Sequence, residues 1–482
     1  MINIQPIMYV TGLLLAALAT SMLIPAAVDW LYRDINAYSF VASAAITAFC
    51  GLMLMFANRT RDPSSISLRE TFLLTSFTWL SSCGFASLPF WLTGSTATFV
   101  DSLFEGVSAL TTTGTTLIHG LDFASPGIVM WRALLQWMGG VGIIVMALTV
   151  LPFLRIGGMQ LFRSEFSDRS EKILPRASQV AGAIVLVYVG LTLACFIALY
   201  GVGMPPLDAL CHAFSTLSTG GLSTSDQSLA HFQSASAEWI VLLFMIIGGS
   251  PLILYARLFQ GEAKPLLRDP QTRTYLVILV VCALALSLWL WRHDYPFHQA
   301  LRHGFFHVVG TVTTTGFVVD NYENWGSFAQ MLTLVLLMMG ACTGSTSGGV
   351  KILRYQIMFA AVRAQIHQLR RPHGVFHPSY NGKPIPQDVF ISVFTFFGLF
   401  IVSLALLSLA LSMWGLDLMT CFSGALAVLT NTGIGLGALI GPDGTASALP
   451  QGAKWLMMGG MLLGRLEFVT FFILLSRNFW KD

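Results

Sequence analysis

A short phrase of small, mostly hydroxyl-bearing residues closed by glycine occurs four times in this chain of 482 residues. The four copies are Thr111-Thr112-Thr113-Gly114, Ser218-Thr219-Gly220-Gly221, Thr313-Thr314-Thr315-Gly316 and Thr430-Asn431-Thr432-Gly433. Each follows an apolar run with a small residue six places before the final glycine, namely Ser108, Ser215, Gly310 and Ala427. Apolar residues three apart around a small residue suit a short helix packed closely on one face. The repeated unit is therefore predicted to be a short helix that ends in a hydroxyl-rich loop.

Composition predicts that these loops belong to an integral membrane protein. The chain is 55% hydrophobic and only 10% charged, whereas about a quarter of the residues of soluble domains are charged. Many apolar runs reach the ~20 residues that a helical membrane crossing requires. The seven cysteines are scattered without a C-x-x-C pair, which favours apolar packing over disulfides or a metal site. The first run, from near Ile7, lacks a basic segment and a cleavage motif, so it is expected to be a retained helix.

Apolar runs and phrases alternate in a constant order. After two opening spans, each of four units has a long span, a half-length stretch that ends in the phrase, and a second long span. The second long spans of the last three units are expected at 237–259, 327–363 and 452–477. The expected division is 1–67 for two N-terminal helices, and 68–176, 177–271, 272–385 and 386–482 for the four units. Because the half-length stretches are too short to cross a bilayer, they are predicted to be re-entrant and surrounded by protein or water.

The basic residues predict the orientation of the chain. Most of the 26 Lys and Arg residues fall in segments on one side of the predicted spans. The residues expected on the other side are Arg33, Arg132, Arg292, Arg302 and Lys454. Positive charge concentrates on the cytoplasmic side, so both termini are expected in the cytoplasm and all four phrases outside. This distribution requires ten full spans.

The phrase has the chemistry of a cation filter. A dehydrated cation needs oxygens in place of its water shell, and rings of backbone carbonyls supply them in potassium channels. Glycine permits backbone conformations closed to other residues, and threonine adds a hydroxyl oxygen. The short helices would point their partially negative carboxyl ends at the cation. A polar helix cap explains one such phrase, but four copies in equivalent places favour a filter.

With these four units, the chain resembles the Trk/Ktr/HKT superfamily of potassium transporters along its whole length, specifically the bacterial TrkH type, which has two extra N-terminal spans. The resemblance implies an all-α membrane protein of ten transmembrane helices, with four span–pore helix–span repeats in pseudo-fourfold symmetry. It implies one filter glycine per repeat, with the two preceding residues lining the same path. The implied filter residues are Thr112, Thr113, Gly114, Thr219, Gly220, Gly221, Thr314, Thr315, Gly316, Asn431, Thr432 and Gly433. The second copy departs from the pattern, because Gly220 stands where threonine is expected.

The resemblance also implies substrate, partners and location. Potassium is the implied substrate, because sodium-passing relatives often have serine at the first filter glycine and this chain has Gly114. The implied partners are a second copy of the chain, a cytosolic nucleotide-binding regulatory subunit of the TrkA type, and membrane lipid, in the bacterial inner membrane. No cofactor within this chain and no nucleic acid are expected.

A glycine-rich stretch interrupts the second long span of the third unit. Residues 338–349 contain four glycines, each costing roughly 1 kcal/mol relative to alanine in a helix. A small-residue packing interface is one interpretation, and an intramembrane gate beneath the filter, which the resemblance favours, is the other. The implied gate residues are Gly344, Ser345, Thr346, Ser347, Gly348 and Gly349.

Arg465 is the charge expected well inside a span. Such a charge is costly and is a functional candidate by default. It either bridges to another span or to backbone carbonyls, or faces the pore below the filter beside the gate, as the resemblance implies. Eight acidic residues on the outer side either concentrate cations or, for most of them, are ordinary solvated loop charges. These residues are Asp101, Glu105, Asp122, Asp208, Asp226, Glu238, Asp320 and Glu323.

Two other functions compete with potassium transport for a chain of this composition. A secondary solute or sodium-coupled transporter with discontinuous helices is the main alternative, but inverted repeats are typical of many such folds and these four units share one orientation. A membrane enzyme is disfavoured, because no nucleophile–base or metal cluster follows from the spacing. The polar loop 365–386, with its arginines and histidines, suits either a cytosolic partner or anionic lipid.

Overall fold

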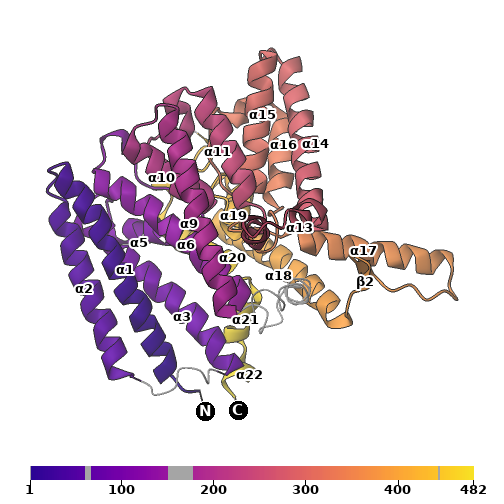
Figure 1. The fold of residues 1–482 in the computed structure, drawn as a ribbon, viewed down its shortest axis with the longest axis horizontal. Coiled ribbons are helices and arrows are strands. Elements are labelled where there is room, and N and C mark those ends of the chain that lie inside the picture. Colours follow the sequence, from indigo (N-terminus) through magenta and orange to yellow (C-terminus); the bar gives the residue numbers. More distant parts are fainter. Residues whose placement is uncertain (1, 60–66, 150–176, 443, 445, 482) are drawn as a thin grey trace.

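The computed structural model describes residues 2–59, 67–149, 177–442, 444 and 446–481. The described chain is mostly helical, and its two ends lie close together at one end of the molecule (Figure 1). Helices α1 (Gln5–Leu31) and α2 (Ala37–Ala57) form an antiparallel pair along one flank. Asp29 near the end of α1 accepts hydrogen bonds from Ser125 Oγ (2.6 Å) and Gly127 N (2.5 Å). This carboxylate caps the N-terminus of α6, the helix that begins at Pro126, and so connects the N-terminal helix pair to the rest of the fold.

Four groups of helices follow, each with one short helix ahead of a phrase. The first contains α3 (Leu68–Ala86), α4 (Leu88–Leu92), α5 (Phe99–Leu110), η1 (Leu121–Phe123) and α6 (Pro126–Thr149). The second contains α9 (Ala177–Gly201), α10 (Pro206–Leu217), η2 (Ser228–Phe232), α11 (Ala235–Gly248) and α12 (Leu252–Phe259).

The third group contains α13 (Lys264–Arg268), α14 (Pro270–Arg292), α15 (Phe297–Val312), η3 (Tyr322–Trp325), α16 (Ser327–Leu337) and α17 (Ile352–Arg370). Strands β1 (Ser379–Tyr380) and β2 (Lys383–Pro384) form an antiparallel hairpin after α17. The fourth group contains α18 (Gln387–Ser412), α19 (Leu418–Thr430), η4 (Ala446–Ala448), α20 (Gln451–Arg465), α21 (Val469–Leu475) and α22 (Arg477–Trp480). The short helices predicted before the phrases are therefore present as α5, α10, α15 and α19.

The second long spans of the last three groups are broken, and for the second and fourth groups this corrects the expectation of a continuous helix. The axes of α11 and α12 differ by 96°, and those of α20 and α21 by 113°. Helix α11 ends at Gly248, and Pro251, which lacks an N–H, is the N-cap residue of α12. Glu467 and Phe468 have φ values of 60° and 47°, which a right-handed helix does not accommodate. Between α16 and α17, residues 338–351 form an irregular segment, so the interruption predicted from glycine content is present.

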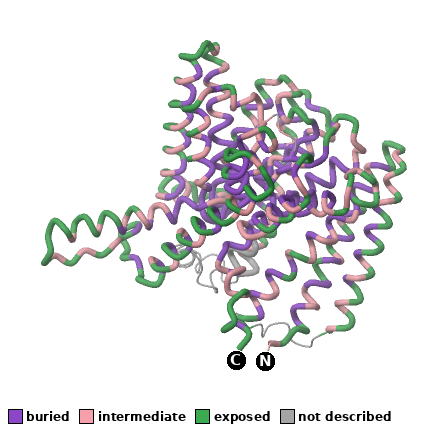
Figure 2. The backbone as a smooth tube through the Cα atoms, turned by 180° about the vertical axis from the view of Figure 1, so that it is seen from behind, coloured by how far each residue is buried: buried purple, intermediate pink, exposed green. Residues whose placement is uncertain are grey.

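Five helices of the described chain are long and apolar enough to cross a membrane, and counting each bent pair as one span raises the number to seven. Large apolar side chains are exposed on the long helices in addition to those buried in the core. Apolar side chains such as Leu186 (74% exposed) and Val281 (60%) cover the outside of long helices, as a lipid-facing surface requires. The buried residues gather at the centre, where the short helices meet (Figure 2), and they include the threonines of all four phrases.

Candidate functional site: four convergent loops

The four phrases form loops with the same unusual backbone. Loops 1 to 4 are residues 111–114, 218–221, 313–316 and 430–433. The second residue of each has positive φ, namely Thr112 (55°), Thr219 (52°), Thr314 (57°) and Asn431 (54°). The final glycines Gly114, Gly221, Gly316 and Gly433 have φ of 89°, 77°, 80° and 75°. Positive φ is uncommon outside glycine, and such strained residues cluster at functional sites.

The backbone hydrogen bonds repeat as well. In each loop the N–H of the residue before the final glycine donates to the carbonyl of the small residue five places earlier, at 2.9 Å in every case. The donor–acceptor pairs are Thr113–Ser108, Gly220–Ser215, Thr315–Gly310 and Thr432–Ala427. Loop 2 thus has the same alignment as the others, with Gly220 in the place of the third threonine. The turn also satisfies carbonyls that a helix end leaves open.

Contacts between neighbouring loops close a ring. Each final glycine lies so close to the next loop that a side chain would overlap the carbonyl oxygen of the residue before that loop's glycine. A Cβ atom would stand 2.1 Å from Gly220 O at Gly114, 1.8 Å from Thr315 O at Gly221, 2.2 Å from Thr432 O at Gly316 and 2.1 Å from Thr113 O at Gly433. The sequence of contacts runs from loop 1 to 2, 3, 4 and back to 1. The four loops therefore surround one axis in chain order.

Side-chain hydroxyls brace three of these loops. The hydroxyl oxygens of the first and third residues are 2.8 Å apart in loop 1, 2.7 Å in loop 3 and 2.8 Å in loop 4. These hydroxyls are paired within their own loops, and the role of threonine as an additional ligand stays a prediction. The backbone carbonyl oxygen of the third residue of each loop lies beside the final glycine of a neighbouring loop, so each loop contributes one such oxygen to the ring.

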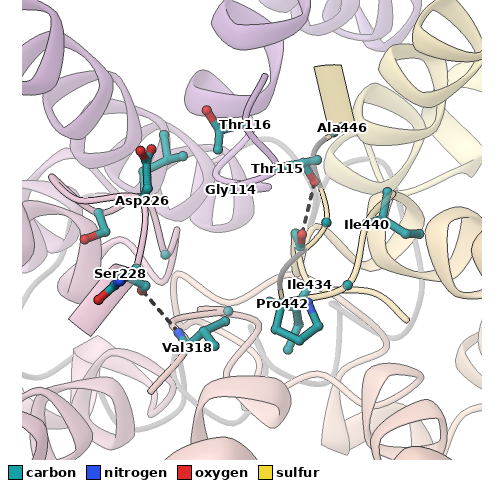
Figure 3. A pocket seen from close by; sticks show the side chains of 18 of the residues that line it. Gly114, Thr115, Thr116, Asp226, Ser228, Val318, Ile434, Ile440, Pro442 and Ala446 are labelled. Atoms are coloured by element: carbon teal, nitrogen blue, oxygen red, sulfur yellow. Dashed lines mark hydrogen bonds between the residues drawn. The ribbon is translucent and has the colours of Figure 1, made fainter. Parts of the chain in front are cut away.

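The final glycines all line one cavity of about 550 Å³, part of which is seen in Figure 3. Thr115 Oγ1 donates to Gly433 O at 3.2 Å and Val318 N donates to Ser228 Oγ at 3.2 Å, which ties adjacent segments of the wall. Asp226 and Asp320 also line this cavity. The cavity at the mouth of the ring is therefore large enough to hold a hydrated ion, and carboxylates line it.

Asp320 is held as an anion at this mouth. Its Oδ2 lies 3.2 Å from His303 Nδ1 and accepts a hydrogen bond from Trp325 Nε1 at 3.2 Å. Burial raises the pKa of Asp320, but the hydrogen bond and charge of His303 together with the Trp325 donor leave its pKa below the ordinary value. A negative charge at the mouth attracts cations.

Three of the eight acidic residues predicted on the outer side are buried in ion pairs, so neither of the two interpretations offered for the group describes these three. Glu105 Oε1 lies 2.8 Å from Arg132 Nε, Asp101 Oδ1 lies 2.6 Å from Lys454 Nζ, and Glu238 Oε2 lies 2.9 Å from Arg302 Nε. Glu105 also accepts from Thr116 Oγ1 and Leu117 N, at 2.8 and 3.0 Å. These pairs brace the short helices and loops, and Asp226 and Asp320 remain at the mouth.

The segment 338–351, called the gate segment after the role expected of it from sequence, lies against the ends of loops 2 and 3. Thr346 Oγ1 donates to Leu217 O at 3.0 Å and lies 3.2 Å from the Thr219 hydroxyl. Gly348 N donates to Thr314 Oγ1 at 2.7 Å. The second residues of loops 2 and 3 thus contact the gate segment, whose backbone is buried within protein as membrane depth demands.

Arg465 lies beside the gate segment, as the family resemblance implied, and is 2% exposed. Its guanidinium donates to Gly139 O on α6 at 3.0 Å and to Thr346 O at 3.4 Å. It is thus a bridge to backbone carbonyls, one of the two interpretations of this charge, and one of those carbonyls belongs to the gate segment. Arg465 stands directly after Gly464, where a Cβ would lie 2.3 Å from Leu429 O.

Four buried residues beside the ring and the gate segment had no predicted role, namely Lys351, Arg354, Glu467 and Gln136. Lys351 and Arg354, counted from sequence as cytoplasmic charges, are 8% and 1% exposed. Lys351 Nζ donates to Ser347 O, and Arg354 pairs with Glu467. Gln136 of α6 contacts loop 2 and is fully buried. Glycine content and the intramembrane charge of Arg465 were the available signals, and these partners follow from the tertiary contacts.

Known proteins of the same architecture cover the whole chain. The TrkH family model, described as a cation transport protein, matches residues 37–481. The Trk system potassium uptake protein TrkI of Halomonas elongata is 40% identical over 478 residues, covering 99% of this chain and 97% of the relative. TrkH of Escherichia coli K12 is 34% identical, with full coverage of both chains.

The crystal structure of the potassium transporter TrkH from Vibrio parahaemolyticus superposes with a TM-score of 0.92, at 34% identity, and covers 100% of both chains. Family match, full-length identity and fold agree with the ring of four loops and its cation-attracting mouth. The chain therefore belongs to the TrkH family of cation transport proteins, which are transporters and not enzymes.

Proposed function

We propose that this protein mediates potassium uptake across a bacterial inner membrane, and that loops 1 to 4 are its selectivity filter. The observation that carries the proposal is the closed ring of contacts between final glycines and neighbouring carbonyls. Carbonyl oxygens around one axis replace the water shell of a cation. The names of the relatives, which are potassium uptake proteins, favour potassium as the ion.

The filter comprises the twelve residues predicted from sequence, three from each loop. The short helices α5, α10, α15 and α19 end at the ring, so their partially negative carboxyl ends favour a cation there. All four present the same end to the axis, which favours four repeats of one orientation over the inverted repeats expected for many secondary transporters. Ten spans, the division at 68, 177, 272 and 386, and cytoplasmic termini complete the proposed topology. The shared location of the termini supports an even number of spans (Figure 1).

The gate segment and Arg465 form the proposed closure below the filter. Thr346 and Gly348 contact the second residues of loops 2 and 3, so the segment blocks the inner end of the ring. A buried positive charge next to that segment raises the barrier to a cation. Opening is proposed to require displacement of this segment, driven by a cytosolic nucleotide-binding subunit of the TrkA type acting on a homodimer.

The test measures ion flux through purified protein in liposomes. Potassium influx is expected to exceed sodium influx, and the gene is expected to restore growth of a potassium-uptake-deficient bacterial host at limiting potassium. Equal potassium and sodium fluxes through correctly inserted protein would refute the selectivity, and absence of both fluxes, with and without the regulatory subunit, would refute the pore.

A further inference from the structure

Loop 2 lacks the hydroxyl pair that braces the other three loops. Its first residue, Ser218, has a hydroxyl that donates to Ser215 O at 3.1 Å. Its third residue, Gly220, has no side chain to pair with that hydroxyl. Nevertheless the backbone of loop 2 has the same positive φ values and the same 2.9 Å hydrogen bond as its counterparts. Another group must therefore hold the Gly220 carbonyl in place.

Gln136 of α6 supplies that group from the neighbouring repeat. Its Nε2 donates to Gly220 O at 2.7 Å. Its Oε1 accepts from Ser215 Oγ at 2.6 Å and from Leu222 N at 3.2 Å. The side chain is fully buried, and its amide thus joins the end of α10, the carbonyl at the ring and the residue after the loop.

A side chain at position 220 would overlap the side chain of Gln136. A Cβ atom at Gly220 would lie 2.3 Å from Gln136 Cδ and 2.5 Å from both Nε2 and Oε1, and these are its three nearest atoms. The φ of Gly220 is not in the left-handed region, so its backbone accepts a side chain. Threonine occupies this position in the other three loops. Glycine stands here because Gln136 fills the volume, not because the backbone demands it.

The hydrogen bond from Gln136 alters the chemistry of one carbonyl oxygen of the ring. A carbonyl oxygen has two lone pairs, and the Gln136 amide engages Gly220 O, which lies next to Gly114 in the ring. The Gln136 amide that donates to this oxygen is fixed by two further hydrogen bonds, from Ser215 Oγ and Leu222 N. The Gly220 oxygen therefore presents a weaker field to a cation than a carbonyl oxygen without such a donor. Selectivity depends on the geometry and field strength of the coordinating carbonyls.

We propose that Gln136 is a positioning residue that sets potassium-over-sodium selectivity through the Gly220 carbonyl, in place of the missing hydroxyl pair. This inference rests on the proposed filter. It predicts reciprocal compensation: a threonine at position 220 becomes acceptable, and useful, only when the Gln136 side chain is removed.

Four variants test the pair in liposomes, with the potassium-to-sodium flux ratio as readout. Gln136→Ala is expected to lower the ratio about tenfold, because a buried hydrogen-bonded group is lost. Gly220→Thr alone is expected to lower it at least as much, since the new side chain overlaps Gln136. The double variant Gln136→Ala/Gly220→Thr is expected to recover to within about threefold of wild type, because the introduced hydroxyl can pair with Ser218.

Controls separate this role from general stability. Gln330→Ala removes another glutamine amide that donates to a backbone carbonyl, that of Glu323 at 2.9 Å, and is expected to leave the ratio unchanged. Gln136→Met keeps an unbranched side chain without the amide; it is expected to lower the ratio even if the alanine variant does not fold. A double variant no better than the worse single variant overturns the proposal.

The outcomes also distinguish this inference from the filter assignment. If Gly114→Ser changes the flux ratio while folded Gln136→Met does not, the inference fails and the filter stands. If neither variant changes the ratio, the filter assignment itself fails.

Discussion

Gly114→Ser is the sharpest perturbation of the ring. Gly114 has a φ of 89°, and a Cβ there would lie 2.1 Å from Gly220 O. A side chain in a left-handed conformation costs about 1–2 kcal/mol. In addition, the Gly220 oxygen must retreat by about 0.9 Å for the two atoms to reach the 3.0 Å separation below which Cβ contacts essentially do not occur. Retraction of one oxygen changes both the cavity size and the number of coordinating dipoles, the two proposed sources of potassium selectivity.

If the retraction of the Gly220 oxygen destabilises the potassium-bound ring by about 1–2 kcal/mol, the potassium-to-sodium flux ratio should decrease by a factor of roughly 5–30. The assay compares the two fluxes in liposomes containing equal amounts of folded protein. The matched control is Gly203→Ser, because Gly203 has a similar φ of 94° with no atom within 4 Å of a built Cβ. The control variant has a similar left-handed backbone strain, but its new side chain overlaps no neighbouring atom. An unchanged ratio in folded Gly114→Ser, or an equal decrease in the control, would refute the reasoning.

Three other changes test the gate and the bracing of the loops. Deleting Gly344–Gly348 should raise potassium flux, because the segment contacts the inner end of the ring; a folded deletion variant with wild-type flux would contradict the gate. Arg465→Ala should raise potassium conductance, measured in planar bilayers, by removing a buried positive charge, and loss of folded protein instead would favour a purely structural bridge. Glu105→Gln should lower the thermal unfolding midpoint, because removing one partner of a buried pair costs about 3–5 kcal/mol. Asp122→Asn, whose partner His231 lies 3.7 Å away at the surface, should leave the midpoint unchanged, and an equal effect would argue against the importance of the buried pair with Arg132.

Local properties made part of this site predictable. The short helices before each loop follow from apolar spacing, which a helix reads directly. The loop ends at the final glycines follow from backbone conformations that glycine adopts readily. The interruption between α16 and α17 follows from the cost of four glycines in a helix. The threonines had to be buried among protein, because an apolar chain leaves polar groups no other place at membrane depth.

Long-range contacts decided the rest. The pairing of Asp101 with Lys454 joins residues 353 positions apart. The hydrogen bond from Gln136 to Gly220 O, at the position where the other loops have threonine, joins two repeats. Hydropathy does not record the bends between α11 and α12 and between α20 and α21, because each pair is apolar enough to be read as one span. Lys351 and Arg354 were counted as cytoplasmic charges from the distribution of basic residues, and their contacts with Ser347 O and Glu467 follow only from the folded structure.

The sequence by itself determined that four similar loops exist, that each ends a short helix, and that glycine closes each one. These properties depend on residues within one helical turn of each other. Only the tertiary structure decided that the loops meet in a ring in chain order, and that a glutamine from the first repeat replaces the hydroxyl pair of loop 2. Those outcomes depend on which atoms fill the space beside a residue, and that space is created by the packing of segments distant in the chain.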